Sequence, residues 1–196
     1  MGKAERTRQL IIEKAAPVFN KKGIAGTTID DILDATGMAK GGLYGRFENK
    51  EELAKVMVDY MLDKLSKKMT EDMAKEKTAI KKIFAIMNIY LDPFNSLIPG
   101  GCPILNFSVE ADDTDPVLKN TLKNTIERAQ ARIINTIEQG ISNGEISSDI
   151  NAADFAMQMF ASLEGGMLMS RITGNGKYMT GLIRMLKTEL KKYEIK

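Results

Sequence analysis

The sequence predicts an all-helical protein of about nine helices. Apolar residues recur at spacings of three and four along most of the 196 residues, and no segment alternates apolar with polar residues as a half-buried strand would. Glycines, prolines and capping Thr or Asn residues divide this pattern into separate helices. The chain is long enough to bury a sizeable core, so we expect these helices to pack as a globular protein.

Glycines and capping residues indicate four helices in the first third of the chain. The first ends at Gly23, and the second begins after Thr28, whose hydroxyl is suited to cap it. Gly37 supplies a turn before a third helix that runs to Phe47, and Asn49 caps the fourth. Five further helices are expected over about residues 80–93, 104–110, 116–144, 152–171 and 178–193.

Composition excludes several classes of protein. The chain has no histidine, the commonest metal ligand and acid-base group, and its one cysteine, Cys102, excludes an intramolecular disulfide. No apolar run approaches the length of a membrane span, and the charged N-terminal residues lack the apolar core of a signal peptide. We therefore expect a cytoplasmic protein with no metal, no cofactor and no membrane partner.

The glycine-rich stretch of the third helix points to a function. Gly41, Gly42 and Gly45 fall within one short helix, where each glycine costs about 1 kcal/mol relative to alanine. A short helix, a glycine turn and a second short helix that starts with small and basic residues are typical of a helix-turn-helix. In that motif the second helix enters the DNA major groove, and the glycines would let its backbone approach the duplex. The first 50 residues also hold nine Lys/Arg against six Asp/Glu.

This interpretation assigns roles to individual residues. Lys40 can reach a guanine edge or a phosphate, and Thr28 offers a hydroxyl and a helix N-terminus to a phosphate. Leu43 and Phe47 are expected to point inward and hold the unit on the first helix. The predicted DNA-binding residues are Thr28, Lys40, Gly41, Gly42, Tyr44, Gly45, Arg46 and Lys50.

The stretch FNKKGIAGTTIDDILDATGMAKGGLYGRFENKEEL resembles the N-terminal DNA-binding domain of the TetR family of bacterial transcriptional regulators. The resemblance covers about residues 5–55. Residues at the family's signature spacings are Phe19, Gly23, Thr28, Ile32, Ala35, Gly37, Lys40, Leu43, Tyr44, Phe47, Lys50 and Leu53. At Gly42 and Gly45 the family often has larger side chains. We therefore expect few side-chain contacts to the bases and a specificity that depends more on DNA shape.

The resemblance implies a ligand-responsive regulator, not an enzyme. It implies a helix-turn-helix domain over residues 1–49 and an effector-binding and dimerisation domain over residues 50–196. A homodimer would bind a palindromic operator in double-stranded DNA, usually as a repressor, and a small-molecule effector would release it. The family's effector pocket lies among helices four to eight, where the candidate residues are Met87, Asn88, Phe94, Cys102, Asn106, Phe107, Glu110 and Glu164. Each of these is also suited to plain packing.

The last two helices carry more apolar surface than one core needs. Pairing both helices with their copies across a two-fold axis would make a four-helix bundle, and Gly165 and Gly166 would allow close approach. The expected homodimer contacts are Phe155, Met159, Leu163, Met167, Leu182 and Leu186.

Three alternatives stay open from the residues alone. A small helical enzyme would use Cys102 or Glu110, although no histidine is available as a base. A regulator that senses oxidants or electrophiles would use the Cys102 thiol, which follows Gly100 and Gly101 near a helix N-terminus. A helix-turn-helix that binds only protein is disfavoured by cations such as Lys40 at phosphate-contact positions.

Overall fold

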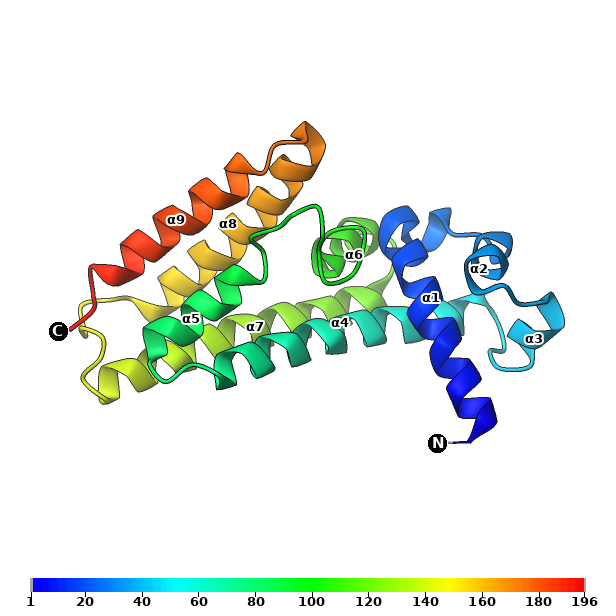
Figure 1. The fold of residues 1–196 in the computed structure, drawn as a ribbon, viewed down its shortest axis with the longest axis horizontal. Helices are drawn as coiled ribbons and strands as arrows, with labels where there is room; N and C mark the ends of the chain where they lie inside the picture. The colour runs from blue at the N-terminus through cyan, green and yellow to red at the C-terminus, as the bar shows by residue number, and fades with distance from the viewer. Residues whose placement is uncertain (1, 196) are drawn as a thin grey trace. The chain divides into compact units, whose positions relative to one another are not determined.

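The computed structural model describes residues 2–195 and contains nine α-helices in this range (Figure 1). The first four are α1 (Lys3–Gly26), α2 (Ile29–Thr36), α3 (Lys40–Tyr44) and α4 (Lys50–Ala74). The other five are α5 (Ala79–Asn88), α6 (Pro103–Ala111), α7 (Pro116–Ser142), α8 (Ala152–Thr173) and α9 (Lys177–Lys191). The all-helical class is confirmed. No helix of the described range has both the length and the apolarity to cross a membrane.

Contacts divide the chain into two compact units. The first unit combines the chain up to Lys64 with Ile98–Leu122, so it holds α1, α2, α3 and α6. The second unit combines Leu65–Leu97 with the chain from Lys123 onward, so it holds α5, α8 and α9. The domain boundary expected after residue 49 falls at the start of α4 and stays a prediction.

Each unit has its own apolar core. In the first unit α2 and α6 pack on α1, and the fully buried side chains include Phe19, Ile32, Leu43, Phe47 and Met57. In the second unit α8 and α9 lie side by side and α5 packs on α9 (Figure 1). Its fully buried side chains include Ile83, Ile137, Met159, Met179 and Leu190.

Two helices end earlier than the apolar spacing predicts. Beyond Tyr44 the chain forms a tighter turn, in which the N–H of Phe47 donates to the carbonyl of Leu43 over 3.1 Å. Beyond Asn88 each of the next three N–H groups bonds the carbonyl three residues earlier, and the chain then leaves the helix before Pro93. The apolar pattern continues through both turns because it reports which residues are buried, not the backbone hydrogen bonds.

Candidate nucleic-acid interface

A reciprocal cap fixes the start of α2. The Thr28 hydroxyl accepts the N–H of Asp31 over 3.1 Å, and the Asp31 carboxylate accepts the N–H of Thr28 over 3.0 Å. The Lys22 ammonium lies 2.6 Å from the same carboxylate. These hydrogen bonds, that of Lys22 first and those of Thr28 next, lower the pKa of Asp31 from 3.8 to about 2. Thr28 is therefore held at an exposed helix N-terminus by a carboxylate that is ionised at neutral pH.

Gly37 makes the turn between α2 and α3. Its φ of 69° is in the left-handed region, and its N–H donates to the carbonyl of Leu33 over 2.8 Å. After this turn Leu43 and Phe47 are buried, as predicted, at 1% and 2% exposure. Their burial on the first unit's core directs the opposite face of α3 outward.

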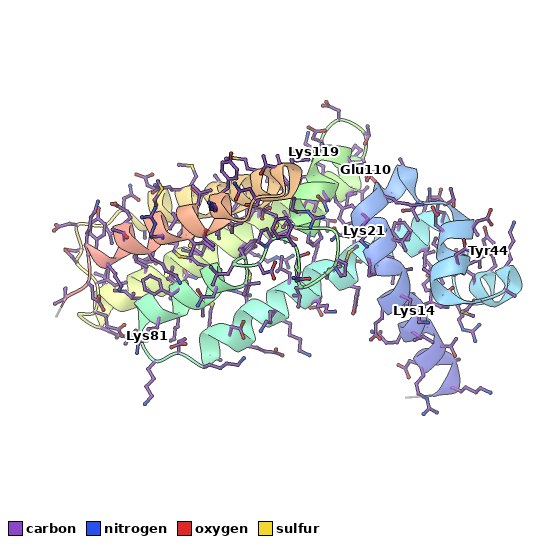
Figure 2. The ribbon with its side chains drawn as sticks, turned by 45° about the horizontal axis from the view of Figure 1, so that its top comes forward. Lys14, Lys21, Tyr44, Lys81, Glu110 and Lys119 are labelled. Carbon is purple, nitrogen blue, oxygen red and sulfur yellow. The ribbon has the colours of Figure 1, made fainter. Side chains whose placement is uncertain are left out.

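The outward face of α3 carries few side chains. Lys40, Gly41, Tyr44 and Gly45 are exposed, and Figure 2 labels Tyr44 on this short helix. A Cβ added at Gly41 would meet no heavy atom within 4 Å. The backbone at Gly41 is therefore accessible, as close approach to another backbone would require, whereas Gly42 is half-buried beside the end of the Met38 side chain.

Two of the predicted DNA-binding cations, Arg46 and Lys50, are half-buried. The Arg46 guanidinium donates to the carbonyl of Gly42 over 2.8 Å and is half-buried against the end of α3. Lys50 is half-buried at the first position of α4, where it lines a small pocket of about 180 Å³ together with Ile24 and Glu110. The phosphate contacts expected of both residues stay predictions.

Helix α6 is attached to the end of α1 by hydrogen bonds that the sequence did not reveal. The Glu110 carboxylate accepts the backbone N–H groups of Ile24 over 2.8 Å and Ala25 over 2.6 Å. These two N–H groups follow Gly23, whose φ of 75° and ψ of 174° break the helix at the predicted end. Figure 2 shows Glu110 on α6 beside this end of α1.

A second attachment lies one turn earlier on both helices. Asn20 is buried on α1, and its side-chain amide donates to the carbonyls of Ile98 and Gly101 over 3.3 and 3.1 Å. The Asn106 amide on α6 in turn donates to the Asn20 side-chain oxygen over 3.0 Å. An asparagine directly after Phe19, on an otherwise apolar face, is the signal in the sequence that marks this buried contact.

The residues expected at an effector site divide between the two units. Cys102, Asn106, Phe107 and Glu110 belong to the first unit, and Met87, Asn88, Phe94 and Glu164 belong to the second. Met87, Phe107, Cys102 and Glu164 are buried, whereas Asn88 and Phe94 are exposed. The Asn106 and Glu110 side chains bind α1, and the Asn88 side chain accepts a hydrogen bond from Lys187. Effector contacts by these residues stay predictions.

The homodimer contacts expected on α8 and α9 stay predictions. Within one chain Phe155, Met159, Leu163, Met167 and Leu186 are each less than 5% exposed, and Leu182 is half-buried. These side chains pack within the second unit. The outward face of α8 instead carries an apolar stripe at helical spacing, made of Met157, Ala161, Gly165, Leu168 and Ile172.

A helix-turn-helix with an exposed, bare second helix, joined to further helices, defines a DNA-binding transcriptional regulator. Two family models match the chain. One, described as bacterial regulatory proteins of the tetR family, matches residues 11–57, and the other, a tetracyclin repressor-like C-terminal domain, matches residues 79–186. The chain belongs to the TetR family of transcriptional regulators, whose members are regulators and not enzymes.

Comparison with individual relatives supports the family membership. The HTH-type transcriptional repressor DhaR of Mycobacterium sp. (strain GP1) is 27% identical over 168 residues, which are 86% of this chain and 84% of that protein. A TetR transcriptional regulator from Chloroflexus aurantiacus J-10-FL has a TM-score of 0.93 and 33% identity, over 99% of this chain and 98% of that one. A TetR-family regulator from Cytophaga hutchinsonii has a TM-score of 0.88 and 34% identity, over 100% and 98% of the two chains.

Proposed function

We propose that this protein is a repressor that binds a near-palindromic operator as a homodimer and is released by a small-molecule effector. The observation that carries the proposal is the bare backbone at Gly41 between the exposed Lys40 and Tyr44 side chains. A helix backbone without side chains can approach the base pairs in the major groove closely, while cations beside it contact bases or phosphates. The relative DhaR, a transcriptional repressor by name, supports the direction of regulation.

Within this proposal the DNA contacts divide into two kinds. Lys40, at the exposed start of α3, contacts a guanine edge, while Lys50, at the start of α4, contacts a phosphate on the flank. Thr28 presents its hydroxyl and the N-terminus of α2 to another phosphate. Gly41, Gly42 and Gly45 contribute by their lack of side chains.

Paired Lys variants test this division of roles. Lys40→Ala is expected to weaken operator binding by about 1–3 kcal/mol and to relax specificity. Lys50→Ala is expected to weaken binding to every sequence about equally and to lower the salt slope by about one. Titrations of operator and of mixed DNA at several salt concentrations measure both quantities. The same loss on every sequence and an unchanged slope for both variants would refute the assignment.

The apolar stripe on α8 supports a homodimer. It exposes Met157, Leu168 and Ile172 around the small residues Ala161 and Gly165, and a Cβ at Gly165 would meet no atom within 4 Å. Small residues at the centre of an apolar face allow two helices to approach closely across a two-fold axis. Two recognition helices joined in this way read two half-sites, which one helix alone cannot bind tightly.

For an effector to release the operator, its binding must change the position of α1. Asn106 and Glu110 on α6 bind Asn20 and the two N–H groups at the end of α1, so a shift of α6 acts on the helix that carries the helix-turn-helix. An effector that favours one position of α6 by about 1–3 kcal/mol changes operator occupancy severalfold. The operator must then weaken effector binding by the same factor, which calorimetry with and without operator DNA measures.

Selection of bound fragments from random DNA tests the proposal as a whole. The expected result is a set of near-palindromic sites whose affinity falls steeply with salt concentration. Recovery of no enriched sequence, or of single half-sites bound by a monomer, would overturn it.

The burial of Cys102 argues against the alternative function, a regulator that senses oxidants through this thiol. The side chain is only 4% exposed, and oxidants in the solvent reach a buried thiol poorly.

A further inference from the structure

A cationic pocket lies between α5 and α9 in the second unit, beside the hydrogen bond between Asn88 and Lys187. Its volume is about 380 Å³, which is within the lower range of small-molecule sites. Phe84, Leu91 and Ile183 provide apolar lining, and Arg184, Lys187 and Lys191 provide three positive charges. The pocket therefore combines an apolar surface with concentrated positive charge.

These three cations have no carboxylate partner among residues 2–195. Other lysines of the chain form ion pairs three or four residues away, such as Lys192 with Glu189 and Lys68 with Asp72. Arg184, Lys187 and Lys191 form none within the described residues. Like charges held together without a counter-charge create a local positive potential that an anion would relieve.

Lys187 is held in place by neutral groups. Its ammonium lies 2.6 Å from the side-chain oxygen of Asn88 and 5.2 Å from the centre of the Phe84 ring, and the Lys191 ammonium lies 5.9 Å from the same ring. Burial, and next the charge of Lys191, lower the pKa of Lys187. Both ammonium groups therefore lie near the Phe84 ring before any ligand binds.

We propose that this pocket binds a small organic anion with an aromatic or aliphatic body and a carboxylate or phosphate head group. The body packs against Phe84, Leu91 and Ile183, and the head group binds Arg184, Lys187 and Lys191. An open pocket of this volume has room for one small molecule. The proposal does not depend on operator binding.

The test uses 1-naphthoate as the probe, with neutral 1-naphthamide and acetate as reference compounds. We expect calorimetry on the 196-residue protein to give affinity for 1-naphthoate at least about tenfold higher than for either reference, because only this compound engages both the apolar lining and the cations. Amide NMR shifts should map to α5 and α9. Shifts confined to other helices, or equal affinity for the neutral amide, would overturn the proposal.

Substitutions of the lining residues test whether 1-naphthoate binds in this pocket. Lys187→Gln combined with Lys191→Gln should weaken 1-naphthoate binding about tenfold, whereas Lys177→Gln, at the exposed start of the same helix, should leave it unchanged. Phe84→Leu removes the ring and should also weaken binding. Thermal unfolding checks that each variant folds. If the double variant and Lys177→Gln bind 1-naphthoate with the same affinity as the parent, these cations do not form the site.

Discussion

The Glu110 carboxylate accepts the backbone N–H of Ile24 over 2.8 Å, directly after the break in α1 at Gly23. A second N–H, that of Ala25, binds the same carboxylate over 2.6 Å. A helix that breaks leaves backbone groups without intrahelical partners, and here a charged side chain from α6 satisfies two of them. The start of the helix-turn-helix is thus tied to a helix 86 residues further along the chain.

Removal of this carboxylate is expected to loosen the end of α1. Glu110→Ala should lower the free energy of unfolding by about 1–3 kcal/mol, because two hydrogen bonds to a charged group are lost and one donor, the N–H of Ile24, stays partly buried. Asp113→Ala, an exposed carboxylate just beyond α6, is the matched control and should change stability little. Urea unfolding measures the difference. Amide exchange should quicken at Ile24 and Ala25 in the first variant only, and unchanged exchange there would contradict this account.

Acid should weaken the cap of α2. The pKa of Asp31 is about 2 in the folded protein, below its ordinary 3.8, because Lys22 and Thr28 bind the ionised form. The carboxylate therefore contributes stability that is complete above about pH 4 and is lost as the pH falls towards 2. An NMR titration should give this low pKa in the parent and a higher pKa in Lys22→Gln. Equal pKa values in the two proteins would show that Lys22 is not the main cause.

Two glycines of the helix-turn-helix should respond to alanine with opposite signs. Gly41→Ala should raise the free energy of unfolding by up to about 1 kcal/mol, because the site has open space and lies in a helix. Gly37→Ala should lower it by about 1 kcal/mol or more, because φ there is 69°. Gly41→Ala should nevertheless weaken operator binding if the backbone approaches DNA. Chemical denaturation and operator titration of both variants measure these effects.

Helix α3 should be among the least protected segments of the free protein. It has five residues, three glycines in and beside it, and no side-chain cap at its N-terminus. Amide exchange over residues 40–47 should be much faster than in α7 and should slow when operator DNA binds. Equal protection of α3 and α7 in the free protein would show that buried Leu43 and Phe47 hold the helix fully formed.

A charge on the α8 stripe should separate the proposed homodimer. Leu168→Glu and Ile172→Glu each place a carboxylate on an exposed apolar face and should raise the dimer dissociation constant at least about tenfold. Val117→Glu, at an exposed apolar residue on α7, is the matched control and should leave it unchanged. Analytical ultracentrifugation over a concentration series measures all three. The same dissociation constant in all of them would exclude this stripe from the interface.

Local chemistry in the sequence determined most of the helices and the helix-turn-helix itself. Thr28 caps α2, Gly37 turns the chain in the left-handed region, and Asn49 accepts the N–H of Glu52 at the start of α4, as their residue types predict. Leu43 and Phe47 are buried as their spacing predicts. Caps, turns and short apolar spacings involve residues close in the chain, so the sequence contains all the partners that decide them.

Tertiary structure decided which polar groups meet and which apolar face stays exposed. Nothing near Glu110 in the sequence indicates that its partners are the N–H groups of Ile24 and Ala25. Helix α8 is apolar on more than one side, so its periodicity does not tell whether Met159 or Met157 faces the core. Packing against α9 buries Met159 and leaves Met157 exposed. Burial depends on neighbours distant in the chain, and therefore only the folded structure assigns each apolar face to a core or to a surface.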